Sequence, residues 1–234
     1  MDPAAVRARL AGVRDRIARA ADRAGRDPSS VRLVAVSKTF SAEFIQAAAA
    51  NGQVDFGENK VQEALGKIEQ TARLSLRWHL VGHLQSNKAR KAAQAFDVIH
   101  SIDSLDLLRR VDAAAADAGR RVHALVQVDL GREPTKHGAA LEDVAALFSH
   151  AAQLHAVRLV GLMTLPPPVD DQEGARPFFH QLRDLRDRLI AGGIPSAMLT
   201  ELSMGMSHDF EVAIEEGATL VRIGTAIFGS RSYV

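Results

Sequence analysis

Short runs of apolar and β-branched residues alternate with longer amphipathic runs from one end of the chain to the other. Eight short runs predict strands, at 32–37, 54–56, 78–81, 98–100, 122–128, 157–161, 198–202 and 219–223. Between them, alanine-rich stretches with helical periodicity predict helices, including 41–51, 104–118, 139–153 and 173–192, and another amphipathic helix precedes the first strand at 3–24. Strict alternation of strand and helix is typical of a parallel sheet.

Eight β/α units in 234 residues predict one closed (β/α)8 TIM barrel with an extra N-terminal helix. No linker or fixed repeat divides 1–234, so a single domain is expected. A doubly wound open sheet is the alternative. In a barrel, polar residues at the carboxyl ends of the strands line the active site, so these residues are the candidates for chemistry.

Composition narrows the class of protein. Lys and Arg number 29 against 28 Asp and Glu, so the net charge of +1 gives no sign of nucleic-acid binding, and the arginines of 3–24 are interpreted as a solvated helix face. The absence of cysteine excludes disulfides and thiolate metal sites. Neither a signal peptide nor an apolar run that could span a membrane is visible, and a cytoplasmic protein is expected.

The first strand ends in a lysine. Lys38 follows Val36 and Ser37 at the expected mouth of the barrel, where partial burial lowers the pKa of an amine and a neutral amine forms imines. A lysine that only reaches toward water is the alternative. After the second strand, Asn59 can hydrogen-bond a ligand hydroxyl, and Glu58 is predicted to cap the next helix.

Three other features allow two interpretations each. His79 and His83 have the spacing of a helical metal pair, but in a strand that spacing separates the side chains by about 13 Å, so no metal site is predicted. Met163 either packs in the core or contacts an aromatic ligand ring. Lys136, in a long charged loop, is either a second amine near the site or a loop charge.

Both of the last two strands end in small residues before a predicted helix. Ser203 ends the seventh strand region, and Gly224 and Thr225 follow the eighth. Glycine lets backbone approach a ligand, hydroxyls add donors, a helix N-terminus favours anions, and β/α barrels often bind phosphate after these two strands. A pair of ordinary helix caps is the alternative.

Arg222 stands just before the end of the eighth strand. If it points inward it needs a partner, either a pyridine nitrogen, which it would keep unprotonated, or a carboxylate such as Glu201 or Asp129. With Lys38 and the phosphate-binding strand ends, the pyridine interpretation describes a ligand that has an aldehyde, a ring and a phosphate. That ligand is pyridoxal 5′-phosphate (PLP), for which a protein supplies binding and electronic tuning.

Nearly the whole chain also resembles the pyridoxal phosphate homeostasis proteins, or proline synthetase co-transcribed family, which is itself similar to the N-terminal barrel domain of alanine racemase. The motifs that carry the resemblance are 35–39, 56–59, 78–79, 82–88, 100–103, 161–163, 202–207 and 221–229. The resemblance implies that seven residues hold the cofactor. They are Lys38 through a Schiff base, Ser203, Gly224 and Thr225 at the phosphate, Arg222 at the pyridine, and Asn59 and Met163 along the cofactor.

The resemblance further implies a cytoplasmic monomer that stores or delivers PLP and keeps cofactor and amino-acid pools in balance, with apo PLP-dependent enzymes as candidate partners. A two-base racemase needs a second acid or base on the opposite ligand face, and in the racemases a tyrosine of a separate domain supplies it. The one tyrosine here is Tyr233, beside the end of the sequence. We therefore expect a non-catalytic carrier and regulator. An enzyme of racemase or lyase type is the second hypothesis, and a phosphate-binding barrel without imine chemistry is the third.

Overall fold

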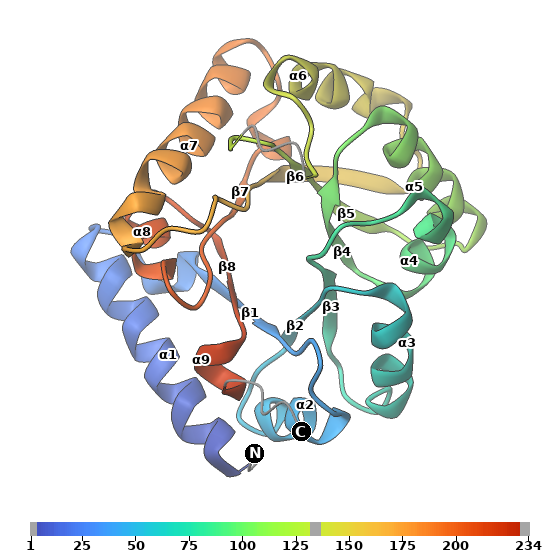
Figure 1. The fold of residues 1–234 in the computed structure, drawn as a ribbon. Helices are drawn as coiled ribbons and strands as arrows, with labels where there is room; N and C mark the ends of the chain where they lie inside the picture. The colour runs from blue at the N-terminus through green and yellow to red at the C-terminus, as the bar shows by residue number, and fades with distance from the viewer. Residues whose placement is uncertain (1–3, 132–136, 230–234) are drawn as a thin grey trace.

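Eight parallel strands close into a barrel in chain order, with β8 paired to β1 (Figure 1). This computed structural model describes residues 4–131 and 137–229. The strands are β1 Arg32–Val36, β2 Asp55–Glu58, β3 Arg77–Leu80, β4 Val98–Ile102, β5 Val122–Gln127, β6 Val157–Met163, β7 Glu201–Ser203 and β8 Leu220–Ile223. The TIM barrel predicted from the alternation is confirmed, and the open-sheet alternative is wrong.

Helices form a shell around the barrel (Figure 1). They are α1 Ala4–Arg23, α2 Ala42–Ala49, α3 Val61–Gln70, α4 Ala89–Ala95, α5 Leu105–Asp117, α6 Leu141–Ser149, α7 Arg176–Ala191, α8 Phe210–Glu215 and α9 Thr225–Phe228. The seventh strand starts at Glu201, later than predicted, because Ser196–Met198 forms a 3-10 turn. Among the described residues, no helix has the length and apolar character needed to cross a membrane.

Side chains on the strands alternate between the barrel interior and the helical shell, as the two-residue period of a strand requires. On β1, Leu33 and Ala35 join the larger core beneath the helices, whereas Val34 and Val36 belong to a separate interior cluster. Lys38 lies two residues beyond Val36 and lines a cavity at the carboxyl end of the barrel. The alternation that builds the core therefore also turns Lys38 inward.

The extra N-terminal helix α1 packs along α8 and α9 (Figure 1). Its apolar side is buried, and two of its arginines reach α8: Arg16 pairs with Glu211 at 2.7 Å and Arg23 with Glu215 at 2.9 Å. Arg16 also lies over the Phe210 ring. Both side chains stay exposed to solvent, so these two ion pairs are compatible with the interpretation of the arginines as a solvated helix face.

Candidate functional site

A cavity of about 570 Å³ opens at the carboxyl ends of the strands, within the size range of small-molecule sites. Five of the seven residues predicted from the sequence line it together: Lys38, Asn59, Arg222, Gly224 and Thr225. The other two, Ser203 and Met163, are fully buried and do not line it. Lys136, the candidate second amine, lies outside the described residues.

The backbone on both sides of Lys38 is held by α3. Lys67 donates to the Ser37 carbonyl at 2.8 Å, and the Glu63 carboxylate accepts from the Thr39 N–H. Lys67 also bonds Glu63 directly at 2.6 Å. Thr39 has φ of 68°, a left-handed conformation that is unusual for a β-branched residue and persists only where its surroundings impose it. These contacts fix the direction in which Lys38 leaves the strand.

Glu58 completes this arrangement, and we term Lys67, Glu63 and Glu58 the clamp. Glu58 is fully buried and accepts from Lys67 at 2.7 Å and from the Ser37 hydroxyl at 2.6 Å. Burial raises the pKa of Glu58, and the bonds from Lys67 and Ser37 oppose that rise. The prediction that Glu58 caps the next helix is wrong, because the strand alternation turns it toward α3, where Lys67 meets it.

Asn59 reaches the cavity wall because the chain opposite it is a glycine. A Cβ on Gly82 would lie 2.3 Å from the Asn59 carbonyl oxygen, so any other residue would push the two loops apart. His83, the next residue, lines the same cavity. The close approach of the loops after β2 and β3 therefore shapes this wall.

Ser207, Gly224 and Thr225 form a polar end of the cavity. The Ser207 Oγ accepts from the N–H of Gly224 at 3.2 Å and of Ala226 at 3.4 Å. Since that oxygen accepts, its hydroxyl hydrogen can still be donated to an anion. The sequence places Ser203 in this role, but the structure has Ser207 at the cavity and Ser203 beneath it.

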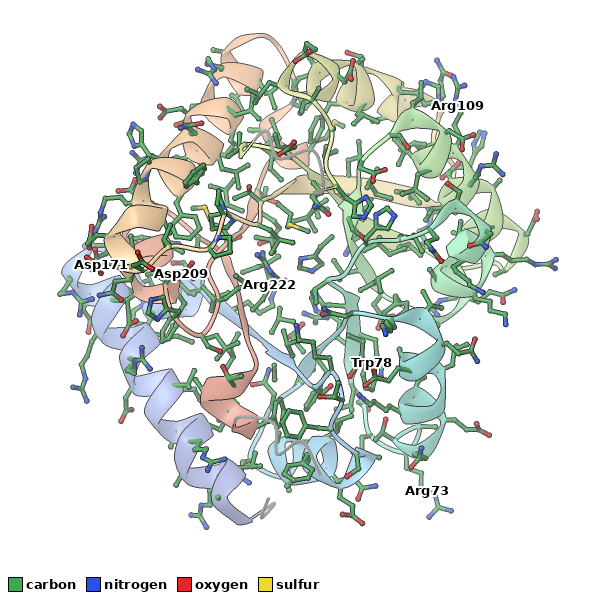
Figure 2. All side chains as sticks on the ribbon, in the orientation of Figure 1. Arg73, Trp78, Arg109, Asp171, Asp209 and Arg222 are labelled. Carbon is green, nitrogen blue, oxygen red and sulfur yellow. The ribbon has the colours of Figure 1, made fainter. Side chains whose placement is uncertain are left out.

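Arg222 lies inside the ring of strands (Figure 2) and is almost fully buried. It donates to the Ser203 hydroxyl at 2.6 Å and to the Thr164 carbonyl at 2.9 Å. Neither carboxylate considered from the sequence, Glu201 or Asp129, is among these partners. Burial lowers the pKa of Arg222 to about 10, with Asp209 opposing the fall, so it remains a cation at neutral pH. Because it lines the cavity, Arg222 presents a desolvated positive charge to any ligand there.

A buried chain of hydrogen bonds continues from Arg222 across the barrel. Ser203 Oγ lies 2.8 Å from His100 Nδ1, His100 Nε2 lies 2.8 Å from His79 Nδ1, and His79 Nε2 lies 2.9 Å from the Asp55 carboxylate. We term these five residues the relay. Arginine can only donate and a carboxylate can only accept, so neutral histidines satisfy every bond when each carries its hydrogen on Nε2. Burial lowers the pKa of both histidines, in agreement with that neutral form.

Comparison with known proteins identifies the family. The alanine racemase N-terminal domain family matches residues 9–232. A pyridoxal phosphate homeostasis protein of Aquifex aeolicus is 43% identical over 225 residues, which cover 96% of this chain and 98% of the relative. Its counterpart in Pseudomonas aeruginosa is 45% identical over 224 residues, covering 96% and 95%. This chain belongs to the family of the pyridoxal phosphate homeostasis proteins.

A solved structure of the same kind is also similar. PipY of Synechococcus elongatus PCC7942 with PLP bound has a TM-score of 0.84 and 42% identity, over 96% of this chain and 100% of that chain. The resemblance found from the sequence motifs is thus confirmed. In the present chain, Met163 packs in the interior cluster with Val36 and Val81. Since both valines line the cavity, Met163 supports the cavity floor from below.

Proposed function

We propose that this chain binds PLP in the cavity at the barrel mouth and acts in PLP homeostasis. One observation carries the proposal: an amine, a buried guanidinium and a polar, anion-accepting end line a single cavity of suitable size. The names of the relatives and the PLP bound to PipY support it. When bound, the cofactor supplies an electrophilic aldehyde and an aromatic ring that accepts electrons.

The chain's own residues divide the binding of this ligand between them. The Lys38 amine would hold the cofactor through a Schiff base with its aldehyde, formed with loss of water. Arg222 would donate a hydrogen bond to the pyridine nitrogen and, because it stays protonated, would leave that nitrogen without a proton of its own. Ser207 and Thr225 would hold the phosphate through their hydroxyl groups, and Gly224, whose N–H is donated to Ser207, would let the backbone approach it closely. Asn59 would hydrogen-bond the ring substituent that faces it.

Borohydride reduction of the PLP-loaded protein, followed by peptide mass spectrometry, tests the covalent step. We expect the cofactor on Lys38. The visible absorbance band of the bound cofactor should be lost in Lys38→Ala but kept in the control Lys91→Ala, which changes an exposed lysine of α4. The same spectrum reports whether Lys136 carries cofactor as well. A band that persists in Lys38→Ala, or reduced cofactor on other lysines alone, would contradict the assignment.

The proposal includes a carrier and regulator in place of an enzyme, and a cytoplasmic monomer that hands PLP to apo enzymes, as the family resemblance implies. Transfer from the loaded protein to an apo enzyme should then be faster than release into buffer that holds a PLP scavenger. Equal rates would show that delivery requires no contact. Gel filtration with light scattering tests the monomer.

A specific observation favours testing the enzyme hypothesis too. His83, His137 and His208 line the cavity, so proton-transfer groups are present near the ligand even though Tyr233 lies outside the described residues. Incubation of the loaded protein with D- and L-amino acids in deuterated water measures exchange of the α-proton. We expect no rapid exchange; rapid exchange would establish the racemase or lyase type of activity.

A further inference from the structure

Three side chains with metal-ligating atoms meet at the rim of the cavity. They are His83, Asp103 and His137, and one ligand atom of each lies within 4.8 Å of the others. His83 follows β3, Asp103 directly follows β4, and His137 lies in the loop between β5 and α6. Neighbouring strand ends thus bring together residues that are far apart in the sequence.

The separations suit a common ion. His83 Nδ1 lies 3.6 Å from Asp103 Oδ2. Bonds of about 2.0–2.1 Å in a tetrahedral zinc site place neighbouring ligand atoms about 3.3 Å apart. The backbone of His137 is anchored, since Gln127 donates to its carbonyl at 2.6 Å, while its side chain is exposed.

The two imidazoles are stacked, with centroids 3.4 Å apart and planes within 8° of parallel. Lone pairs in parallel planes cannot point at one ion, so a bound cation must turn one ring out of the stack. The exposed His137 ring has room for that rotation. Without a cation, the contact between His83 and Asp103 is an ordinary ion pair only if His83 is protonated, which sets a charged ring against His137.

We propose that His83, Asp103 and His137 bind a divalent transition-metal cation of the Zn²⁺ class. Two imidazoles and one carboxylate favour Zn²⁺, Ni²⁺, Co²⁺ or Cu²⁺ over Mg²⁺ or Ca²⁺, which prefer oxygen ligands. Because His83 and His137 also line the cavity, the ion lies at its wall, and a fourth coordination position remains for water or a ligand. The site does not depend on the proposed PLP function.

Calorimetric titration of the tag-free, cofactor-free protein with ZnCl₂ tests the site. The chain has no cysteine, so no thiolate contributes to binding. We expect one site in the wild type and affinity weaker on the order of tenfold or more in His137→Asn and in Asp103→Asn, which change two different ligands. His155→Gln removes an exposed histidine away from the cavity and should bind like the wild type.

Two outcomes support the proposal and two overturn it. Tighter Zn²⁺ binding in the wild type and the control than in both ligand variants supports it, as does a Co²⁺ absorption spectrum that disappears in the same variants. A wild type that binds no Zn²⁺ overturns it. Unchanged affinity in both ligand variants overturns it too, because the ion would then be bound elsewhere. Circular dichroism of each variant establishes that its fold is intact.

Discussion

Lys67→Met removes the cation of the clamp while it keeps most of the side-chain volume. The ammonium is nearly buried and bonds Glu58, Glu63 and the Ser37 carbonyl. Without it, the Glu58 carboxylate stays fully buried, and its Oε2 already lacks a hydrogen-bond partner among the described residues. Breaking a buried pair by removing one partner costs about 3–5 kcal/mol, whereas an exposed pair contributes at most about 1 kcal/mol. We expect Lys67→Met to lower the free energy of unfolding by about 3–5 kcal/mol, as for a buried pair. PLP binding should also weaken, because Ser37 adjoins Lys38.

The loss of stability in Lys67→Met should grow as the pH rises. At low pH Glu58 takes up a proton and no longer carries an unpaired buried charge. Burial raises the pKa of Glu58 and Lys67 opposes the rise, so the variant has a still higher pKa. A carboxyl whose pKa is raised in the folded state makes the folded protein bind more protons than the unfolded chain above the ordinary value of 4.5. Stability therefore falls as pH rises from there, and the deficit should be smaller at about pH 5 than at about pH 8.

Urea unfolding followed by tryptophan fluorescence measures this deficit. Trp78 is the only tryptophan and is buried against Phe56, so its emission reports the fold. Glu58→Gln in the Lys67→Met background should recover part of the loss, since no buried charge remains, and Lys91→Met should stay close to the wild type. A deficit below about 1 kcal/mol, or one that is equal at both pH values, would refute a charge-based clamp.

Three further expectations follow from the same contacts. Gly82→Ala should lower the free energy of unfolding by about 1–3 kcal/mol, because the added Cβ meets the Asn59 backbone. Gly12→Ala, which has open space on α1, should raise it by up to about 1 kcal/mol, and calorimetric melting compares the two variants. His100→Gln should reduce the loss of stability on acidification. Because the pKa of His100 is lowered in the folded state, the folded protein binds fewer protons than the unfolded chain below the ordinary value of 6.5, and its stability falls as the pH falls. Urea titrations across that pH range measure the slope. Ser207→Ala should weaken binding of PLP more than of pyridoxal, whereas Ser203→Ala should affect both similarly, as equilibrium titration with each ligand will show.

The barrel was predictable because strand and helix periodicities are local properties of the sequence. The cavity was partly predictable because residues just beyond strand ends must face the barrel mouth, as Lys38 and Thr225 do. The choice between Ser203 and Ser207 was not. Ser203 is the last residue of β7 and Ser207 lies in the loop that follows, and the turn between them passes through Gly205 with φ of 90°, which decides the serine that reaches the cavity. Such a turn leaves only a glycine in the sequence as a signal.

The partners of the cavity residues were missed for a different reason. Asp55 and His79 point inward from β2 and β3, but neither is at the carboxyl end of its strand, where candidate residues were expected. The two-residue period along the whole of each strand does predict that both side chains lie inside the barrel. Their pairing, however, depends on the register between strands, which no local pattern specifies. The same limit hid the meeting of His83 with His137, since one of them lies in a long loop.

The clamp and the relay fix the two ends of the site independently. The clamp holds the backbone beside Lys38 from the helical shell, and the relay holds Arg222 from the barrel interior. Buried polar networks of this kind are rigid, so the clamp sets the position of the backbone beside Lys38, and the relay sets that of the Arg222 guanidinium, before any ligand arrives. A lysine on a fixed backbone and a guanidinium that keeps its proton suit the binding of the proposed cofactor at two separate points.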